Sequence, residues 1–197
     1  MKMKLGALVL VGMTTLGTCA FSQAKLEAFP VGTTTMVFTV TTEDLSAPQT
    51  LELQVVVHPN STYTVRMRAE ATGTGDQLSG FGFLFGAAGL AYGGGEDVSL
   101  SALQVLVDQR SRLQEGDEYL LPGGGTFTDV ALVDIAGVRC VEGSYVDPKN
   151  RDTRMTVAFG ISKPVYTVPR VRVERLRGGT WQTVFLMELV AYTFVGP

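Results

Sequence analysis

Apolar and polar residues alternate along the first half of this sequence, and a period of two is typical of half-buried β-strands. Threonines separate Met36, Phe38 and Val40, and polar residues separate the leucines and valines that follow. The alternating segments are residues 34–42, 50–58 and 62–70. The sequence His58-Pro59-Asn60-Ser61 favours a turn between the second and third segments. We therefore expect an antiparallel meander with one solvated face.

Each of these segments has a predicted buried face. Its members are Met36, Phe38 and Val40, then Leu51, Leu53, Val55 and Val57, then Tyr63, Val65, Met67 and Ala69. In the third segment, Arg66, Arg68 and Glu70 occupy the opposite, outward face.

The C-terminal half also favours strands over helices. The whole chain has 25 valines but 2 isoleucines, with 22 threonines and 23 glycines, and this balance is typical of strands and turns. Gly178-Gly179 is the strongest hairpin signal, because two glycines suit the positive φ angles of a tight β-turn. The predicted strands are residues 126–135, 138–146, 153–161, 169–177 and 180–194, with a turn at Ala136-Gly137 and a polar loop at 147–152.

One window of the sequence changes to helical spacing. Leu100, Leu103, Leu106 and Arg110 recur every three or four residues, which predicts a helix over about 98–112. The expected fold class is mainly β: a strongly curved antiparallel sheet or open β-barrel with one main α-helix.

Residues 1–24 have the three parts of a secretory signal peptide: two early lysines, a short apolar stretch and the small-residue site Ser22-Gln23-Ala24. We expect cleavage after Ala24, which leaves residues 25–197 as a single exported β-rich domain, periplasmic or extracellular. The apolar stretch is short for a membrane span, so we expect no transmembrane span in the mature chain. The alternatives are an uncleaved anchor and lipid attachment at Cys19, which has a leucine three positions before it.

The net charge argues against a nucleic-acid partner. Sixteen basic and 19 acidic residues give −3, and removal of the leader with its two lysines gives −5. Residues 25–152 carry −9 and residues 153–197 carry +4. Four arginines of this basic end lie on one predicted strand: Arg170, Arg172, Arg175 and Arg177. Alternation divides them between two faces, so we expect a solvated edge strand.

Catalytic and metal-binding chemistry lack candidate residues in the sequence. The single histidine, His58, lies at a hairpin tip, and the Gly-x-Ser-x-Gly pattern of a nucleophile elbow is absent. One histidine and two cysteines exclude a Cys/His zinc site. We expect a protein that is not an enzyme, without catalytic residues, metal ligands or a cofactor. Cys140 is the one cysteine of the mature chain, and we expect it to be buried and inert.

An aromatic cluster supplies the candidate binding residues. Phe81, Phe83 and Phe85 alternate with other residues, so their rings would share one face of a strand, and Tyr92 follows among glycines. Small-molecule sites are mostly apolar, so these four residues are candidates for lining an apolar ligand cavity. The alternative is ordinary core packing.

A turn and a late hairpin in the C-terminal part resemble those of a known class. The turn is Leu121-Pro122-Gly123-Gly124-Gly125-Thr126-Phe127, and the hairpin ends with Glu188-Leu189-Val190-Ala191-Tyr192. Over about residues 116–194, this pattern is similar to the ending of periplasmic open β-barrel proteins of the lipoprotein-carrier-like class. The resemblance implies a curved antiparallel sheet wrapped around a helix, with an apolar concavity that accepts acyl chains. Those proteins usually have a helix before the first strand, whereas strands here begin almost at once.

The functional hypothesis is non-catalytic binding of a lipid or other apolar ligand in the cell envelope. A second hypothesis, from another class, is a structural module whose sheet edge meets an envelope protein. A third is a secreted hydrolase that uses acidic residues.

Overall fold

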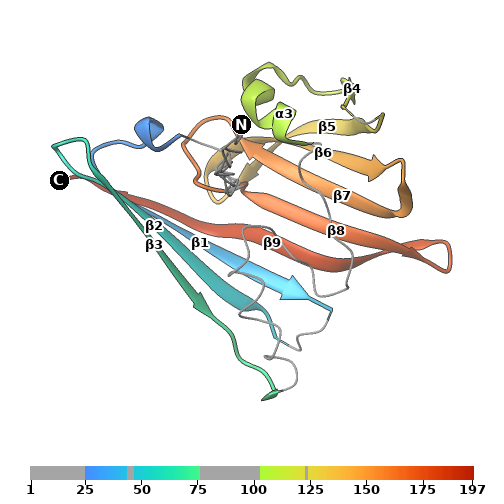
Figure 1. Ribbon diagram of the computed structural model, residues 1–197, viewed down its shortest axis with the longest axis horizontal. Coiled ribbons are helices and arrows are strands. Elements are labelled where there is room, and N and C mark those ends of the chain that lie inside the picture. The colour runs from blue at the N-terminus through green and yellow to red at the C-terminus, as the bar shows by residue number, and fades with distance from the viewer. Residues whose placement is uncertain (1–24, 44–46, 76–102, 123) are drawn as a thin grey trace, which may run out of the picture.

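Nine antiparallel strands form one sheet in the computed structural model (Figure 1), which describes residues 25–43, 47–75, 103–122 and 124–197. The strands are β1 (Gly32–Thr42), β2 (Gln49–Val57), β3 (Tyr63–Glu70), β4 (Tyr119–Leu120), β5 (Thr126–Ile135), β6 (Val138–Asp147), β7 (Asn150–Gly160), β8 (Arg170–Arg177) and β9 (Thr180–Val195). Their order in the sheet is β3-β2-β1-β9-β8-β7-β6-β5-β4, and the sheet is not closed. The predicted mainly β class with an open sheet is confirmed.

Strand β9 joins two meanders into this sheet. Its first half, from Thr180 to Glu188, pairs with β8, and its second half, from Phe185 to Val195, pairs with β1. The register shifts between Val37 and Phe38 and again between Val173 and Glu174. Such irregularities bend a strand and increase its twist. Long β9 therefore turns the sheet from one meander to the other (Figure 1).

The predicted alternation of β1 and β2 is confirmed by their burial. Met36, Phe38 and Val40 are buried on β1, and their partners Leu51 and Leu53 are buried on β2. Directly opposed residues share one face of an antiparallel pair, so these side chains form one continuous apolar layer. Val171, Val173, Phe185, Met187 and Leu189 are also buried, on β8 and β9.

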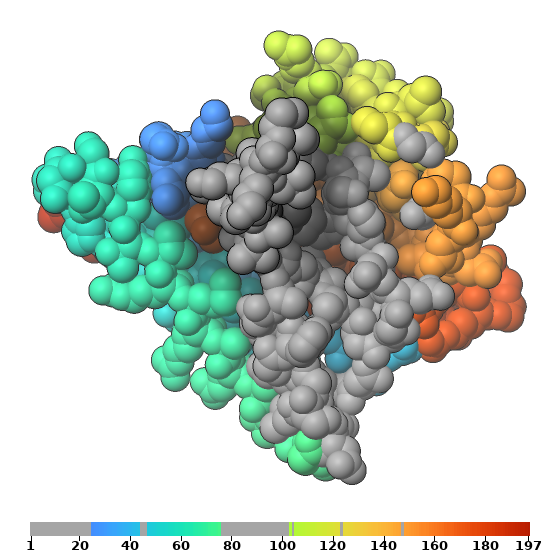
Figure 2. Space-filling model, viewed as in Figure 1, coloured from blue at the N-terminus to red at the C-terminus, as the bar shows by residue number. Residues whose placement is uncertain are grey.

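The predicted buried face of β3 is wrong. Met67 is 56% exposed and Val65 is 38% exposed, and Ala69 is exposed as well, while Tyr63 is half-buried. β3 is the last strand of the sheet next to β2, and it lies along the lower left rim of the molecule (Figure 2). Alternation predicts which residues of a strand share a face, but it does not predict whether that face is buried. An edge strand such as β3 has a neighbouring strand on one side only, so its side chains are more exposed.

The predicted helix over about 98–112 is found in the described part of that range. Helix α3 covers Gln104–Gln109 and continues into the 3₁₀-helix η3 (Arg110–Arg112), whereas residues 98–102 lie outside the described part. Leu103 and Leu106 are buried, as their spacing predicted, and Val107 is also buried. One further 3₁₀-helix, η1 (Leu26–Ala28), precedes β1. Among the described residues, no helix is both long and apolar enough to cross a bilayer.

The predicted turns follow the sequence in three cases and differ in one. The turn predicted at His58-Pro59-Asn60-Ser61 joins β2 to β3. Gly178 and Gly179 have φ angles of 59° and 80°, and Ala136 and Gly137 have 51° and 72°, as expected for tight turns. The polar loop predicted at 147–152 is wrong, because β6 continues to Asp147 and β7 begins at Asn150. Polar composition does not end a strand whose backbone still pairs with its neighbour.

Strand β8 is not the solvated edge that its arginines predicted, because it lies between β7 and β9. Arg170 is 19% exposed, and its guanidinium contacts Glu142 of β6 and Glu188 of β9, each at 2.7 Å. Arg177 pairs with Glu43 at 2.8 Å. The carboxylates of Glu142, Glu188 and Glu43 thus neutralise Arg170 and Arg177.

Candidate functional site

The aromatic residues predicted to line a cavity lie outside the described residues. Phe81, Phe83, Phe85 and Tyr92 all fall in the segment 76–102. Their role therefore stays a prediction, as does that of Cys19 and of the cleavage site after Ala24.

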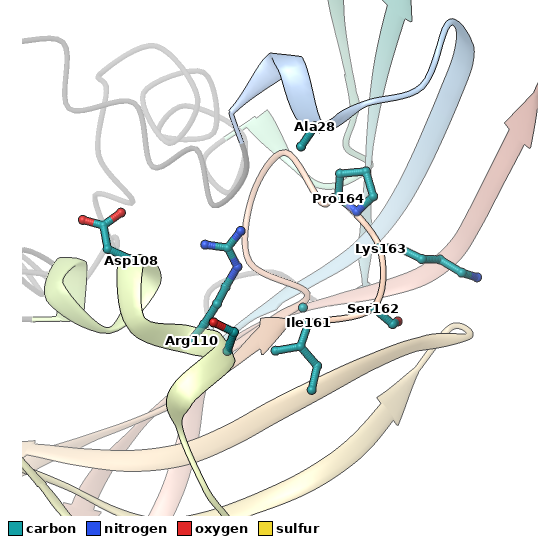
Figure 3. A pocket seen from close by; sticks show the side chains of 9 residues that line it. Ala28, Asp108, Arg110, Ile161, Ser162, Lys163 and Pro164 are labelled. Atoms are coloured by element: carbon teal, nitrogen blue, oxygen red, sulfur yellow. The ribbon is translucent and has the colours of Figure 1, made fainter.

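Beside the helix, the described residues form a hollow of about 350 Å³. Its walls come from three parts of the chain: η1, the end of α3 with η3, and the loop that follows β7 (Figure 3). The lining residues are Ala28, Asp108, Arg110, Ser111, Gly160, Ile161, Ser162, Lys163 and Pro164. This volume is near the lower end of the range for small-molecule sites, ~300–1,000 Å³.

The loop wall of the hollow is fixed to the sheet. The Ile161 amide donates to the Arg139 carbonyl at 2.8 Å, and the Arg139 amide donates to Ser162 Oγ at 2.8 Å. Tyr192 Oη donates to the Pro164 carbonyl at 3.1 Å. Val165, the next residue, is completely buried. These contacts hold the wall in place, as a preorganised site requires.

Arg110 is the charged group that points into this space. Its Nη1 donates to the Val107 carbonyl at 2.5 Å, which holds the side chain against the end of its own helix. Figure 3 shows the guanidinium projecting toward the loop that carries Pro164. Lys163 extends the other way, and its Nζ lies 5.1 Å from the centre of the Tyr192 ring. Arg110 therefore supplies most of the positive charge inside the hollow.

The lining is of mixed polarity, unlike the apolar cavity that the aromatic cluster suggested. Ala28, Ile161 and Pro164 provide apolar surface, while Ser111, Ser162 and Arg110 provide hydrogen-bonding groups. Such a surface suits a ligand with a polar end and an apolar body. Asp108 is the one carboxylate among the described lining residues. No group of three or more His, Cys, Asp or Glu side chains that could hold a metal is found in the described ranges.

A second charged cluster lies across β6 to β9. Arg170 joins Glu142 and Glu188, and Arg154 contacts Glu174 at 2.8 Å while lying 4.7 Å from the centre of the Trp181 ring. Burial alone would lower the pKa of Arg170, but its hydrogen bonds to Glu188 and Glu142 outweigh burial and raise it. This cluster stabilises the sheet and leaves its arginines already engaged.

Cys140 is buried and unpaired, as predicted. Burial raises the pKa of its thiol to about 12, and the nearby Asp134 carboxylate adds to the increase. The thiolate is the reactive form, so Cys140 is inert near neutral pH.

One lining residue of the hollow has a recognisable signal in the sequence. Arg110 occupies a position of the helical repeat that otherwise carries leucines, and a charge on an apolar stripe points to a special environment. No sequence pattern predicts that Ser162 and Pro164 line the hollow, because the fold alone brings their loop close to the end of α3.

Comparison with known proteins found no matching family and no matching curated protein. Among solved structures, one described as the crystal structure of MucB matches with a TM-score of 0.41 and 13% sequence identity. The match covers 92% of this chain and 58% of that chain, so the chain spans less than two thirds of its length. The open antiparallel sheet agrees with the architecture implied by the lipoprotein-carrier-like resemblance.

Proposed function

We propose that this chain is an exported, non-catalytic binding protein of the cell envelope that holds an apolar or amphipathic small molecule beside α3. The observation that carries the proposal is the hollow between the end of the helix and the anchored loop 161–164. Its size, fixed wall and mixed lining suit capture of a ligand by shape and by a few polar contacts. The secretory leader expected at residues 1–24 supports export.

The openness of the sheet also supports a binding role. A closed barrel of few strands fills its interior with side chains, whereas this sheet is open and can be approached beside the elements that lie against it. Here α3, η1 and the loop after β7 cover part of one side, and the hollow lies where the three meet.

Native mass spectrometry of the protein purified from its own envelope tests the proposal. We expect a bound mass in the range of a lipid or other small amphiphile, which organic extraction removes. A ligand-free mass, together with no binding of fatty acids, alcohols or phosphorylated amphiphiles in calorimetry, would contradict it.

A second candidate function, an envelope interaction module, is favoured by the exposed edge strand β3. Met67 and Val65 are exposed there, and the edge of an antiparallel sheet can accept a strand from a partner protein. In the same mass spectra this function predicts a protein-sized partner in fixed ratio. Met67→Lys should remove that partner, whereas Val190→Lys, a matched change at an exposed valine of β9, should retain it.

The hydrolase hypothesis has less support from the hollow. Hydrolysis of glycosides by acidic residues uses two carboxyl groups that face one bond. Asp108 is the single carboxylate that the described residues bring to the hollow.

A further inference from the structure

We infer that Arg110 binds the anionic head of the ligand, so that the hollow selects single-chain amphiphiles ending in a carboxylate or phosphate. The inference rests on the proposed binding function and specifies its ligand class. It starts from the position of Arg110, which is half-buried at the point where α3 passes into η3.

Among the described residues, Arg110 uses little of its hydrogen-bonding capacity. A guanidinium has five N–H donors, and one bond, from Nη1 to the Val107 carbonyl, is found for Arg110. Within the described part of the chain, no carboxylate lies within ion-pair distance of it. By contrast Arg154, Arg170 and Arg177 all pair with glutamates.

The single bond to Val107 also orients the guanidinium. Because Nη1 is held by the helix end, the guanidinium has a fixed direction, and it projects toward the loop that carries Pro164 (Figure 3). A planar guanidinium held in this way can grip two oxygens of a carboxylate or phosphate. An arginine fixed before binding loses less conformational entropy than a mobile one.

The groups around Arg110 suit an anion with an attached chain. Ser111 and Ser162 add hydroxyl groups to the lining, and Lys163 adds positive charge at the rim. Asp108, the one described carboxylate of the lining, does not pair with Arg110 and does not face it in Figure 3. Ala28, Ile161 and Pro164 offer apolar surface to the first part of the chain.

Isothermal titration of the purified protein with decanoate, decyl phosphate and decanol, below their micelle concentrations, tests the inference. We expect both anions to bind about tenfold more tightly than the alcohol, a difference of about 1.4 kcal/mol. Acetate and inorganic phosphate should neither bind measurably nor displace decanoate, because they lack the chain. If inorganic phosphate binds as tightly as decyl phosphate, a free anion is the ligand and the inference is wrong.

Variants of two neighbouring arginines isolate the role of the head. Arg110→Gln should abolish the preference for anions, and Arg110→Lys should keep part of it. Arg112→Gln, on the same 3₁₀ turn but outside the hollow, should behave like the unaltered protein. Thermal unfolding verifies that each variant is folded.

The outcomes separate this inference from the proposed function. Equal binding of all three amphiphiles would overturn the role of Arg110 and leave the binding function standing. An unchanged anion preference in Arg110→Gln would do the same. Absence of binding by every amphiphile would overturn both.

Discussion

Arg170 forms ion pairs with carboxylates on both sides of β8, so we expect its replacement to destabilise the sheet. Its guanidinium contacts Glu142 and Glu188, and its side chain is 19% exposed. In Arg170→Gln, the two carboxylates would face each other across the sheet without a cation. Loss of one member of a buried ion pair costs ~3–5 kcal/mol, and partial exposure of this cluster reduces the expected loss to about 2 kcal/mol. Urea unfolding measures the change.

Arg68 provides the matched control for this prediction. Its contact with Glu70 spans 3.5 Å, and the two side chains are 76% and 71% exposed. An ion pair this exposed contributes little, so Arg68→Gln should cost less than about 0.5 kcal/mol. Equal losses in the two variants would mean that the Arg170 cluster does not stabilise the sheet.

We expect the buried thiol of Cys140 to make the folded protein less stable at alkaline pH. Its pKa is about 12 in the folded protein because the thiol is buried, whereas an unfolded cysteine has a pKa of about 8.5. The raised pKa contributes stability that is fully present below the unfolded pKa and is lost as pH rises toward 12. Above pH 9 we expect a loss of up to about 1.4 kcal/mol per pH unit from this group.

Urea unfolding from pH 8 to 11 measures that slope. In a Cys19→Ser background, the further change Cys140→Ala should make the alkaline decline shallower, although it lowers stability at every pH by removing a buried sulfur. The native thiol should also resist iodoacetamide at pH 8 and react in urea. Rapid alkylation of the native protein, or identical slopes with and without Cys140, would contradict the assignment.

The sequence predicted those features of the strands and turns that depend on residues close together in the chain. The alternation of β1 and β2 and the Gly178-Gly179 turn depend on neighbours in sequence, and both were predicted correctly. The burial of β3 and the central place of β8 depend on which strands lie next to them. The pairing of β1 with β9 joins residues that are far apart in the sequence, such as Thr33 and Val195, and no local sequence pattern predicts it.

The β8–β9 hairpin offers a direct test of its turn geometry. Gly178 has a φ of 59°, and an added Cβ there would meet no atom within 4 Å. The cost of Gly178→Ala is therefore the backbone penalty of a left-handed conformation alone, about 1–2 kcal/mol. Gly178→Asn should cost less, because asparagine tolerates that conformation. Denaturant unfolding of both variants would refute the turn assignment if they lost the same stability.

The fold brings the basic C-terminal part of the chain next to acidic residues of the earlier part. The sequence carries −9 in residues 25–152 and +4 in residues 153–197. In the folded sheet, Arg170 pairs with Glu142 and Arg177 pairs with Glu43, so the basic end meets acidic residues of the earlier part. The hollow could not be predicted from the sequence, because η1, η3 and the loop after β7 are far apart in the chain and come together only in the fold.

The sequence supports the account of the hollow less directly than it supports the fold. Its candidate ligand residues Phe81, Phe83, Phe85 and Tyr92 belong to a segment outside the described residues, whereas the hollow is lined by other groups. Among the residues that line the hollow, Arg110 belongs to the helical repeat of the sequence. The charge of Arg110 can take a binding role because the loop after β7 forms the opposite wall of the hollow.

The most direct test of ligand binding in the hollow is calorimetric titration of decanoate into two tryptophan variants of η1. Ala28 lines the hollow and Glu27, its exposed neighbour, does not, so Ala28→Trp fills the space while Glu27→Trp leaves it open. The account predicts that Ala28→Trp binds at least about tenfold more weakly than the unaltered protein, a loss of about 1.4 kcal/mol, and that Glu27→Trp binds normally. Equal decanoate affinity in the two variants would contradict it.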